Sequence, residues 1–308
     1  MRVSISVQSA YNVDNPREGA RRMIDRARSA REAGLDALFV GDHHATASPY
    51  YQNTAILGRM LAEWGDRPAG ALYLLPLWHP LIVAEQVGTL ACLIPGRFIL
   101  QCAIGPADNQ FEAMGVPVRQ RPSRFEQSLS ILRRLWAGET VTTGGENDRF
   151  GLREARISPC PPEPVEVWIG ASAPPAIDRA ARLGDGWLAA PGLAPSEAAG
   201  QLGLYREACG RHGRPVGVCA IRRDIYVGET AAEAEQAATR VISRGYRGFP
   251  REALIVGDAA QVAASFAELG EMGYDEVVVR HLVQDPARVL QSIGRLAEVR
   301  ERLGARVF

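Results

Sequence analysis

Lysine is absent from this chain, because all 35 basic residues among its 308 are arginine. Schiff-base aldolases, pyridoxal-phosphate barrels and Walker A nucleotide loops each need a lysine amine, so the sequence excludes these three classes. The 35 acidic residues balance the arginines, which gives no electrostatic reason to expect binding to nucleic acid or to an anionic membrane. No run approaches the ~18 uncharged apolar residues that a membrane span requires.

The cysteines exclude a second group of structures. There are five of them, an odd number, and no two have the CxxC spacing. We therefore expect reduced thiols in a cytoplasmic protein, rather than a disulfide framework or a zinc site. Residues 3–7 already resemble a strand, so we expect no signal peptide ahead of the fold.

The apolar segments follow a repeated strand-then-helix pattern. The strands are nearly continuous apolar runs, which is typical of parallel strands covered on both faces. Eight such strands favour an α/β fold with a single (β/α)8 TIM barrel domain over residues 1–308, rather than an open doubly wound sheet. The predicted strands span residues 2–8, 36–40, 69–75, 97–104, 165–170, 187–190, 217–227 and 276–280.

The pattern is interrupted once, around residues 138–164. Residues 140–142 and 156–158 resemble two short strands around a Gly144-Gly145 turn, and a proline-rich link follows. The strand–helix pattern resumes immediately afterwards. We therefore interpret this segment as an insertion between barrel units and not as a domain boundary.

The loop after the fifth strand has the features of an anion site. It runs through Gly170, Ala171 and Ser172 into a proline-started helix that ends at Gly184. Ser172 is expected to cap the helix, and Gly184 is expected to adopt a positive φ. Backbone N–H groups at such a junction lack partners and can bind a phosphate. The alternative is an ordinary capped helix of an α/β protein.

Polar residues follow several strands, at the end of the barrel where active sites lie. We expect one histidine after the second strand, His43, to face the barrel mouth as a proton donor or acceptor. The alternative is that Asp42 and His43 bond backbone groups at the strand end. His79 precedes Pro80, so we expect it to start and cap a helix. The candidate groups are Gln8, Asp42-His43-His44, Trp78-His79, Gly105, Gly170-Ala171-Ser172 and His281.

The paired histidines also suggest a metal site, which we disfavour. Adjacent side chains of an extended segment point to opposite faces, so one ion can hardly use both His43 and His44. Barrel metallohydrolases place an HxH pair on the first strand, and this sequence has none. We expect no metal ligands in this chain.

Taken in order, these segments resemble the bacterial luciferase-like monooxygenase superfamily across nearly the whole chain. The most specific segment begins at Val167 and ends at Trp187. The other matching segments are Gly41-Asp42-His43-His44, His79-Pro80, Pro95-Gly96-Arg97-Phe98, Ala103-Ile104-Gly105 with Phe111-Glu112-Ala113-Met114-Gly115, and the stretch 119–136.

The resemblance implies a barrel that holds reduced FMN, or coenzyme F420, at the carboxyl ends of the strands. His43 matches the histidine that acts in proton transfer at the flavin. Leu72 lies near a position where the family often has a strained non-proline cis peptide. The cofactor-binding residues that the resemblance implies are Asp42, Leu72, Ala103, Gly105, Gly170, Ala171 and Ser172.

Three departures from the family pattern bear on the site. Ala171 replaces the second glycine of the phosphate loop, a mild change if only its N–H is used. Pro106-Ala107 replaces the tyrosine or arginine that many members carry after Gly105, so we do not expect that contact. Ala103 stands at the position of the reactive cysteine of luciferase, so we expect no thiol chemistry beside the ring.

Our main hypothesis is a reduced-flavin-dependent oxidoreductase, a monooxygenase that uses FMNH2 and O2 on a small organic substrate. The first alternative is hydride transfer that depends on coenzyme F420. An alternative of another class is a non-enzymatic protein that binds flavin. The family resemblance further implies a homodimer and, with FMN, a separate flavin reductase as the source of FMNH2.

Overall fold

A closed ring of parallel strands forms the centre of the molecule. The computed structural model describes residues 1–105 and 108–304, and in this part each barrel strand pairs with its neighbour in the order β6-β5-β4-β3-β2-β1-β9-β7, with β7 returning to β6. This ring confirms the predicted (β/α)8 TIM barrel. Its strands are β1 (Arg2–Val7), β2 (Leu38–Val40), β3 (Ala69–Leu74), β4 (Phe98–Ala103), β5 (Glu166–Gly170), β6 (Gly186–Ala189), β7 (Val218–Val227) and β9 (Glu276–His281).

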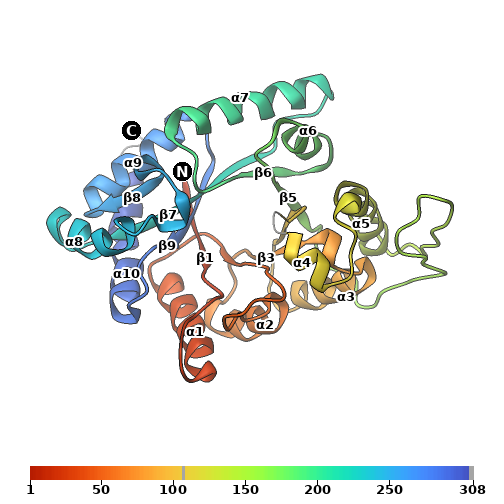
Figure 1. The fold of residues 1–308 in the computed structure, drawn as a ribbon, viewed down its shortest axis with the longest axis horizontal. Coiled ribbons are helices and arrows are strands. Elements are labelled where there is room, and N and C mark those ends of the chain that lie inside the picture. The colour runs from red at the N-terminus through yellow and green to blue at the C-terminus, as the bar shows by residue number, and fades with distance from the viewer. Residues whose placement is uncertain (106–107, 305–308) are drawn as a thin grey trace.

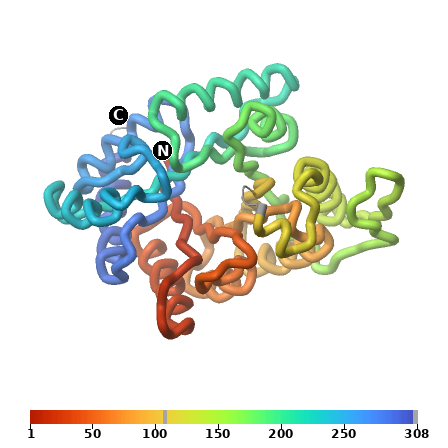
Figure 2. The backbone as a smooth tube through the Cα atoms, in the orientation of Figure 1, coloured from red at the N-terminus to blue at the C-terminus, as the bar shows by residue number. Residues whose placement is uncertain are grey.

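Helices surround this ring, as Figures 1 and 2 show. Within the described residues, no helix combines the length and the apolar character needed to cross a bilayer. The helices are α1 (Pro16–Glu32), α2 (Asn53–Trp64), α3 (Pro80–Ala91), α4 (Asp108–Ala113), α5 (Arg121–Trp136), α6 (Pro174–Leu183), α7 (Pro195–Arg211), α8 (Ala231–Ile242), α9 (Ala259–Met272) and α10 (Pro286–Gly304).

Local sequence signals explain where several helices begin. The Asn15 side chain accepts a hydrogen bond of 3.0 Å from the Arg17 N–H at the start of α1. Asp258 and Gln261 form a reciprocal capping box at the start of α9. These polar caps satisfy backbone donors that the first helical turn leaves free, so they fix the point at which each loop becomes a helix.

Two segments differ from the sequence prediction. A short further strand, β8 (Leu254–Gly257), pairs only with β7 in the described sheet and lies outside the closed ring. The two strands predicted in the insertion are reduced to one antiparallel bridge between Val141 and Ala155. Thr143 N–H donates to Leu152 O next to this bridge, but the segment has no third strand beside it that would extend the pairing.

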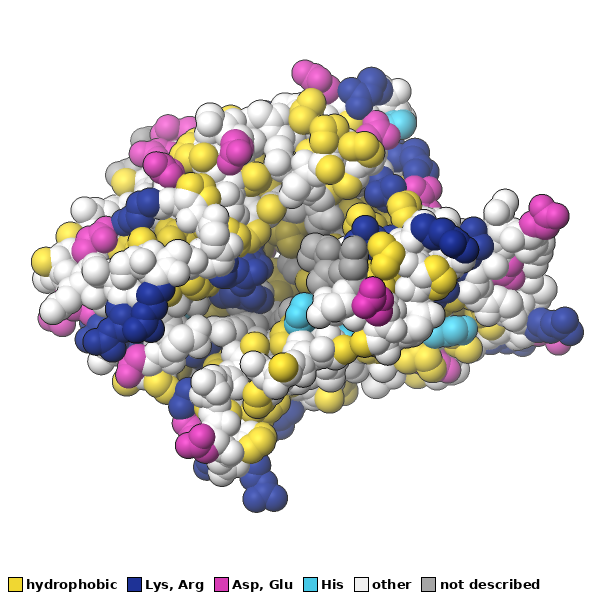
Figure 3. All heavy atoms as spheres, in the orientation of Figure 1, with side chains coloured by type: hydrophobic (Ala, Val, Ile, Leu, Met, Phe, Trp, Pro, Cys, Tyr) yellow, Lys and Arg dark blue, Asp and Glu magenta, His cyan; other side chains and the backbone are white. Residues whose placement is uncertain are grey.

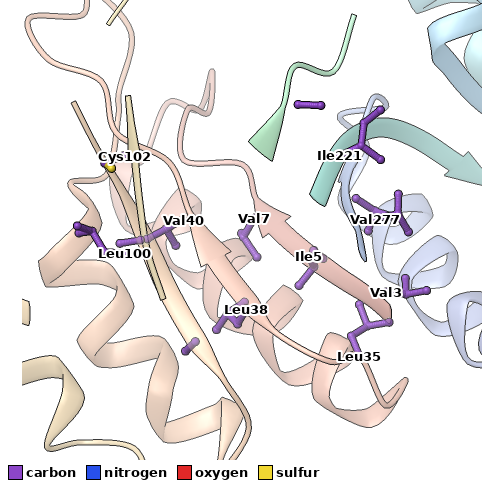
Figure 4. Packing of buried hydrophobic residues seen from close by; sticks show 14 of the residues in the cluster. Val3, Ile5, Val7, Leu35, Leu38, Val40, Leu100, Cys102, Ile221 and Val277 are labelled. Carbon is purple, nitrogen blue, oxygen red and sulfur yellow. The ribbon is translucent and has the colours of Figure 1, made fainter. Parts of the chain in front are cut away.

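Alternation along the strands divides the core into two parts. Val3, Ile5 and Val7 point away from the barrel axis and pack against the helices in the large outer cluster, which Figure 4 shows. The other face of the strands points inward, because successive side chains of a strand alternate. The inner cluster consists of Ala37, Phe39, Ile99, Trp168, Ala220 and Val278.

Two aromatic rings occupy much of the barrel interior. The ring centroids of Phe39 and Trp168 lie 5.6 Å apart, and both side chains are fully buried. Glycine at two neighbouring inward positions leaves room for them. A Cβ on Gly186 would lie 2.7 Å from Trp168 Cδ1, and a Cβ on Gly70 would lie 3.0 Å from Phe39 Cε1.

We predict that Gly70→Ala destabilises the barrel strongly. The added Cβ would lie 2.0 Å from the Ile99 carbonyl oxygen, which belongs to the neighbouring strand and cannot rotate away. The expected loss in the free energy of unfolding is about 3 kcal/mol, the upper part of the range for overpacking. Chemical denaturation with the midpoint and slope measured together provides the test.

Gly58→Ala is the matched control. Gly58 lies in α2, and the nearest atom to an added Cβ is 3.9 Å away. This variant should gain about 0.5–1 kcal/mol, because alanine replaces glycine inside a helix. Equal stabilities of the two variants would contradict the steric argument.

Candidate active site

A cavity of about 1360 Å³ opens at the carboxyl ends of the barrel strands. Figure 3 shows a hollow on this face, with arginine side chains gathered at one edge and a histidine at another. Pockets that bind drug-sized ligands have volumes of about 300–1,000 Å³, so this cavity has room for a coenzyme and a small substrate together. All eight predicted site residues line it, namely Asp42, His43, Leu72, Ala103, Gly105, Gly170, Ala171 and Ser172.

Asp42 connects the ends of two neighbouring strands. Its Oδ2 accepts hydrogen bonds of 2.8 Å from Leu74 N–H and 2.8 Å from Trp78 Nε1–H. His44 Nε2 lies 3.2 Å from Oδ1 of the same carboxylate. Oδ2 thus joins the end of β2 to the end of β3, whereas Oδ1 and His44 Nε2 make no hydrogen bond among the described residues. The backbone-bonding alternative is therefore correct for Asp42.

His43 and His44 point in different directions, as predicted for adjacent residues of an extended segment. His44 packs edge-on against Trp78, with ring centroids 5.2 Å apart. His43 lines the cavity beside Tyr50, with ring centroids 5.7 Å apart. Partial burial is the main cause that lowers the pKa of His43 below 6.5, and the nearby His44 lowers it further, against an opposing effect of Asp42. His43 is consequently neutral at pH 7 and able to accept a proton.

The junction between β5 and α6 differs from the prediction in its hydrogen bonds. Ala173, and not Ser172, is the N-cap residue of α6, and it makes no side-chain cap. Pro174 and Pro175 have no N–H to offer a ligand, and Ala176 N–H donates to Ala173 O at 2.8 Å. The predicted group of free amides is therefore smaller, because the prolines that start the helix also remove its donors.

Three donors remain at this junction. Ser172 and Ala173 are exposed, and no hydrogen bond to the backbone N–H of either residue, or to the Ser172 hydroxyl, occurs among the described residues. Ala171 N–H is used, since it donates to Leu188 O at 3.4 Å. The cavity wall next to these donors contains Gly170, which has no side chain, and Ala103, which has only a methyl group. The free donors can bind a phosphate group, and the small residues leave space for a planar ring that bulky side chains would fill.

One local prediction was wrong, and another was correct for the helix start but not for the side-chain cap. Gly184 has a φ of −88°, and its role is close approach, since an added Cβ would lie 2.8 Å from Gly186 O and 2.9 Å from Ala180 O. His79 is the N-cap residue of α3 but makes no side-chain cap. Its ring packs edge-on against Phe150 at 5.8 Å instead.

Leu72 and His281 occupy regular positions in their strands. Leu72 lies in a regular ladder opposite Gln101, and its carbonyl accepts from Asn53 Nδ2 at 2.7 Å. Among the described residues the one cis peptide bond is Ser158–Pro159, so no cis peptide occurs at Leu72. His281 is buried and is not among the residues that line the cavity. Burial lowers its pKa to about 3, so it is neutral at pH 7.

The sequence prediction missed the cationic side of the cavity. Arg222 and Arg280 line it from β7 and β9, together with Arg247 and Tyr246. Strand alternation could have found the first two arginines, because each stands two residues after an inner-cluster residue of its own strand. Arg121 also lines the cavity and donates through Nη1 to Gly105 O at 3.2 Å.

Two further predictions concern the same region. The Pro106-Ala107 departure lies outside the described residues. Within the described part of the chain, no group of three His, Cys, Asp or Glu side chains is arranged to hold a metal ion.

The fold and the cavity define a (β/α)8 barrel protein in which a neutral histidine and several arginines line one large cavity. Comparison with known families identifies the family to which the chain belongs. The luciferase-like monooxygenase model matches residues 1–307, so this chain belongs to the luciferase-like monooxygenase family. This is the family that the sequence resemblance implied, and the relatives described next are named as enzymes.

Two curated relatives are similar in sequence to part of this chain. An F420-dependent glucose-6-phosphate dehydrogenase of Nakamurella multipartita is 32% identical over 203 residues, which are 62% of this chain and 58% of that protein. The enzyme of the same name from Beutenbergia cavernae is 34% identical over 178 residues, 53% of this chain and 50% of that protein. This chain thus spans little more than half the length of the curated relatives it matches.

Solved structures match along nearly the whole length. The oxygenating constituent of 3,6-diketocamphane monooxygenase from Pseudomonas putida, in complex with FMN, has a TM-score of 0.83 at 17% identity and covers 97% of this chain and 98% of its own. An F420-dependent secondary alcohol dehydrogenase with an F420-acetone adduct has a TM-score of 0.79 at 19% identity and covers 98% and 99%. At these identities the likeness concerns the fold.

We predict that Asp42→Ala lowers the free energy of unfolding by about 2 kcal/mol or more. The change leaves the Leu74 N–H and Trp78 Nε1–H without their acceptor, and each buried unsatisfied donor costs about 1–3 kcal/mol. Asp42→Asn keeps one amide oxygen as acceptor and should lose less. Urea denaturation of both variants measures the difference, and a larger loss for Asp42→Asn would contradict this assignment.

Proposed function

We propose that this chain is a coenzyme F420-dependent oxidoreductase that removes a hydride from a small organic alcohol. The observation that carries the proposal is the pair of curated relatives, both named F420-dependent glucose-6-phosphate dehydrogenases, at 32% and 34% identity. The structures that suggest FMN and oxygen chemistry have lower identity, 17% for the FMN complex. The relatives therefore favour F420-dependent hydride transfer over the FMN-dependent monooxygenase hypothesis.

The residues at the β5–α6 junction are suited to the phosphate group of the coenzyme. The backbone N–H groups of Ser172 and Ala173, the Ser172 hydroxyl and the amino end of α6 offer donors and a favourable dipole. Gly170 and Ala103 leave space for the ring system along the cavity wall. The coenzyme supplies, when bound, an acceptor for one hydride, which carries two electrons.

His43 takes the proton in this proposal. The substrate carbon loses hydrogen as hydride, the C–O bond becomes a carbonyl, and the hydroxyl proton moves to an imidazole nitrogen of His43. The lowered pKa keeps that imidazole neutral at pH 7, which is the form that a general base needs.

A comparison of coenzymes tests the proposal. F420 should bind the purified protein at least about tenfold more tightly than FMN, a difference of about 1.4 kcal/mol, and the protein should reduce oxidised F420 in the presence of alcohols. Fluorescence titration and the absorbance of F420 provide the two readouts. Tighter binding of FMN, with oxygen uptake on addition of FMNH2, would favour the monooxygenase instead.

A matched pair of serine variants locates the phosphate. Ser172→Ala should weaken F420 binding, because it removes one donor at the junction. Ser130→Ala should leave the binding unchanged, since Ser130 is exposed on α5 and does not line the cavity.

We predict that alcohol oxidation depends on pH through His43. Burial lowers the pKa of this imidazole below 6.5, so activity should be constant near neutrality and fall only below that lowered pKa, as His43 becomes protonated. His44, Asp42 and the Tyr50 ring are the groups that face it. His43→Asn should reduce kcat by about 10²–10⁴-fold and abolish the acidic limb. An acidic limb that persists in the variant would assign the titration to another group.

A further inference from the structure

Three arginines occupy one side of the cavity with a single carboxylate among them. Arg222 comes from β7, Arg280 from β9 and Arg247 from the turn η3 (Tyr246–Gly248). The carboxylate belongs to Asp224, which is opposite Arg280 in the β7–β9 ladder. Figure 3 shows arginine side chains gathered at one edge of the hollow.

Asp224 is fully engaged within the protein. Its two oxygens accept from Arg222 Nε at 3.1 Å and Arg222 Nη2 at 3.3 Å. Tyr246 Oη also donates to Oδ2 at 2.8 Å. The Asp224 side chain is fully buried, and this bidentate pair fixes the plane of the Arg222 guanidinium.

Arg280 has no such acidic partner. Its Nη2 donates to the neutral Ser6 hydroxyl at 3.1 Å. Its Nε is buried and has no hydrogen-bond partner among the described residues, and no described carboxylate lies within 4.0 Å of its guanidinium. An unpaired charge in a partly buried site is costly unless a ligand completes it.

The cluster keeps its positive charge at neutral pH. Burial is the first cause that lowers the pKa of Arg222, to about 10, and the nearby charge of Arg280 is the second. Arg222 therefore remains protonated at pH 7. Arg247 is exposed at the mouth and stacks on Phe249, with its guanidinium carbon 5.2 Å from the ring centroid. Three cations and one carboxylate leave an excess of two positive charges on this wall.

The position of Arg280 separates it from the proposed site of the coenzyme phosphate. In the ring of eight strands, β9 lies opposite β4, which ends beside Gly105 and the phosphate junction. Arg280 is instead close to the end of β2, because its Nη2 lies 3.4 Å from the place of a Cβ on Gly41. His43 follows Gly41 by two residues, so an anion bound at Arg280 lies near the end of the strand that precedes the proposed base.

We propose that Arg222 and Arg280 bind an oxyanion group of the substrate, a carboxylate, sulfonate or phosphate, while its alcohol carbon reacts beside His43. Guanidinium groups recognise such oxyanions through paired N–H donors. This assignment of the anion to the substrate rests on the proposed function. It makes the substrate class an anionic alcohol.

Calorimetric titration with inorganic phosphate at constant ionic strength tests the site. The free protein and the F420-saturated protein should both bind phosphate. Arg280→Gln should weaken the binding by about ten- to hundredfold, the range of a charge-assisted hydrogen bond. Arg280→Lys, which keeps the charge but loses the planar fork, should show a smaller loss and covers the case in which the glutamine variant folds poorly.

Two further variants should show tighter or unchanged phosphate binding, which a general loss of structure would not produce. Asp224→Asn removes the one carboxylate of the cluster and should tighten phosphate binding severalfold. Arg134→Gln should bind phosphate as the unchanged protein does, because Arg134 is paired with Glu139 on the outside of α5.

The titration separates failure of this inference from failure of the proposed function. Phosphate binding that is absent, or equal in Arg280→Gln and Arg134→Gln, would overturn the anion site whatever the coenzyme does. Phosphate binding that depends on Arg280 in a protein that does not bind F420 would support the anion site and overturn the coenzyme proposal.

Discussion

The contact between Phe39 and Trp168 inside the barrel determines where a ligand can bind. These rings, 5.6 Å apart and fully buried, fill the interior at the level of the inner cluster. The barrel is therefore closed below this level, and space remains only above it, at the carboxyl ends of the strands. Inward positions two residues further along, such as Gly41, Gly170 and Arg222, then line the cavity.

The sequence was sufficient for the ring of strands because parallel strands covered on both faces are apolar almost throughout. It was insufficient for β8, whose four residues (Leu254–Gly257) also fit the lead-in to a helix capped by Asp258. The strand content of the insertion was overestimated for a similar reason. Two short apolar segments predict strands, but only the Val141–Ala155 bridge forms, because no additional strand supports them.

The sequence predicted where the site lies in the barrel, but it did not predict the hydrogen bonds within the site. The order of strand and loop placed His43 and Ser172 at the same end of the barrel. The partners of Asp42 could not be read from its neighbours in sequence, since Leu74 N–H is 32 residues away. At the β5–α6 junction the prolines that predicted the helix start also removed its amides, an effect that depends on which residue becomes the N-cap.

The cavity separates the tasks of binding and chemistry between its two sides. The side built from β2 to β5 carries the neutral His43 and the wall of small residues, and Oδ2 of Asp42 is bonded to Leu74 N–H and Trp78 Nε1–H. The side built from β7 and β9 carries the guanidinium groups. Binding energy gained there, away from the reacting carbon, can orient the substrate against His43. Replacing the inward residues of β7 and β9 would then change the substrate and leave the proposed hydride transfer in place, which is how one barrel can support different reactants.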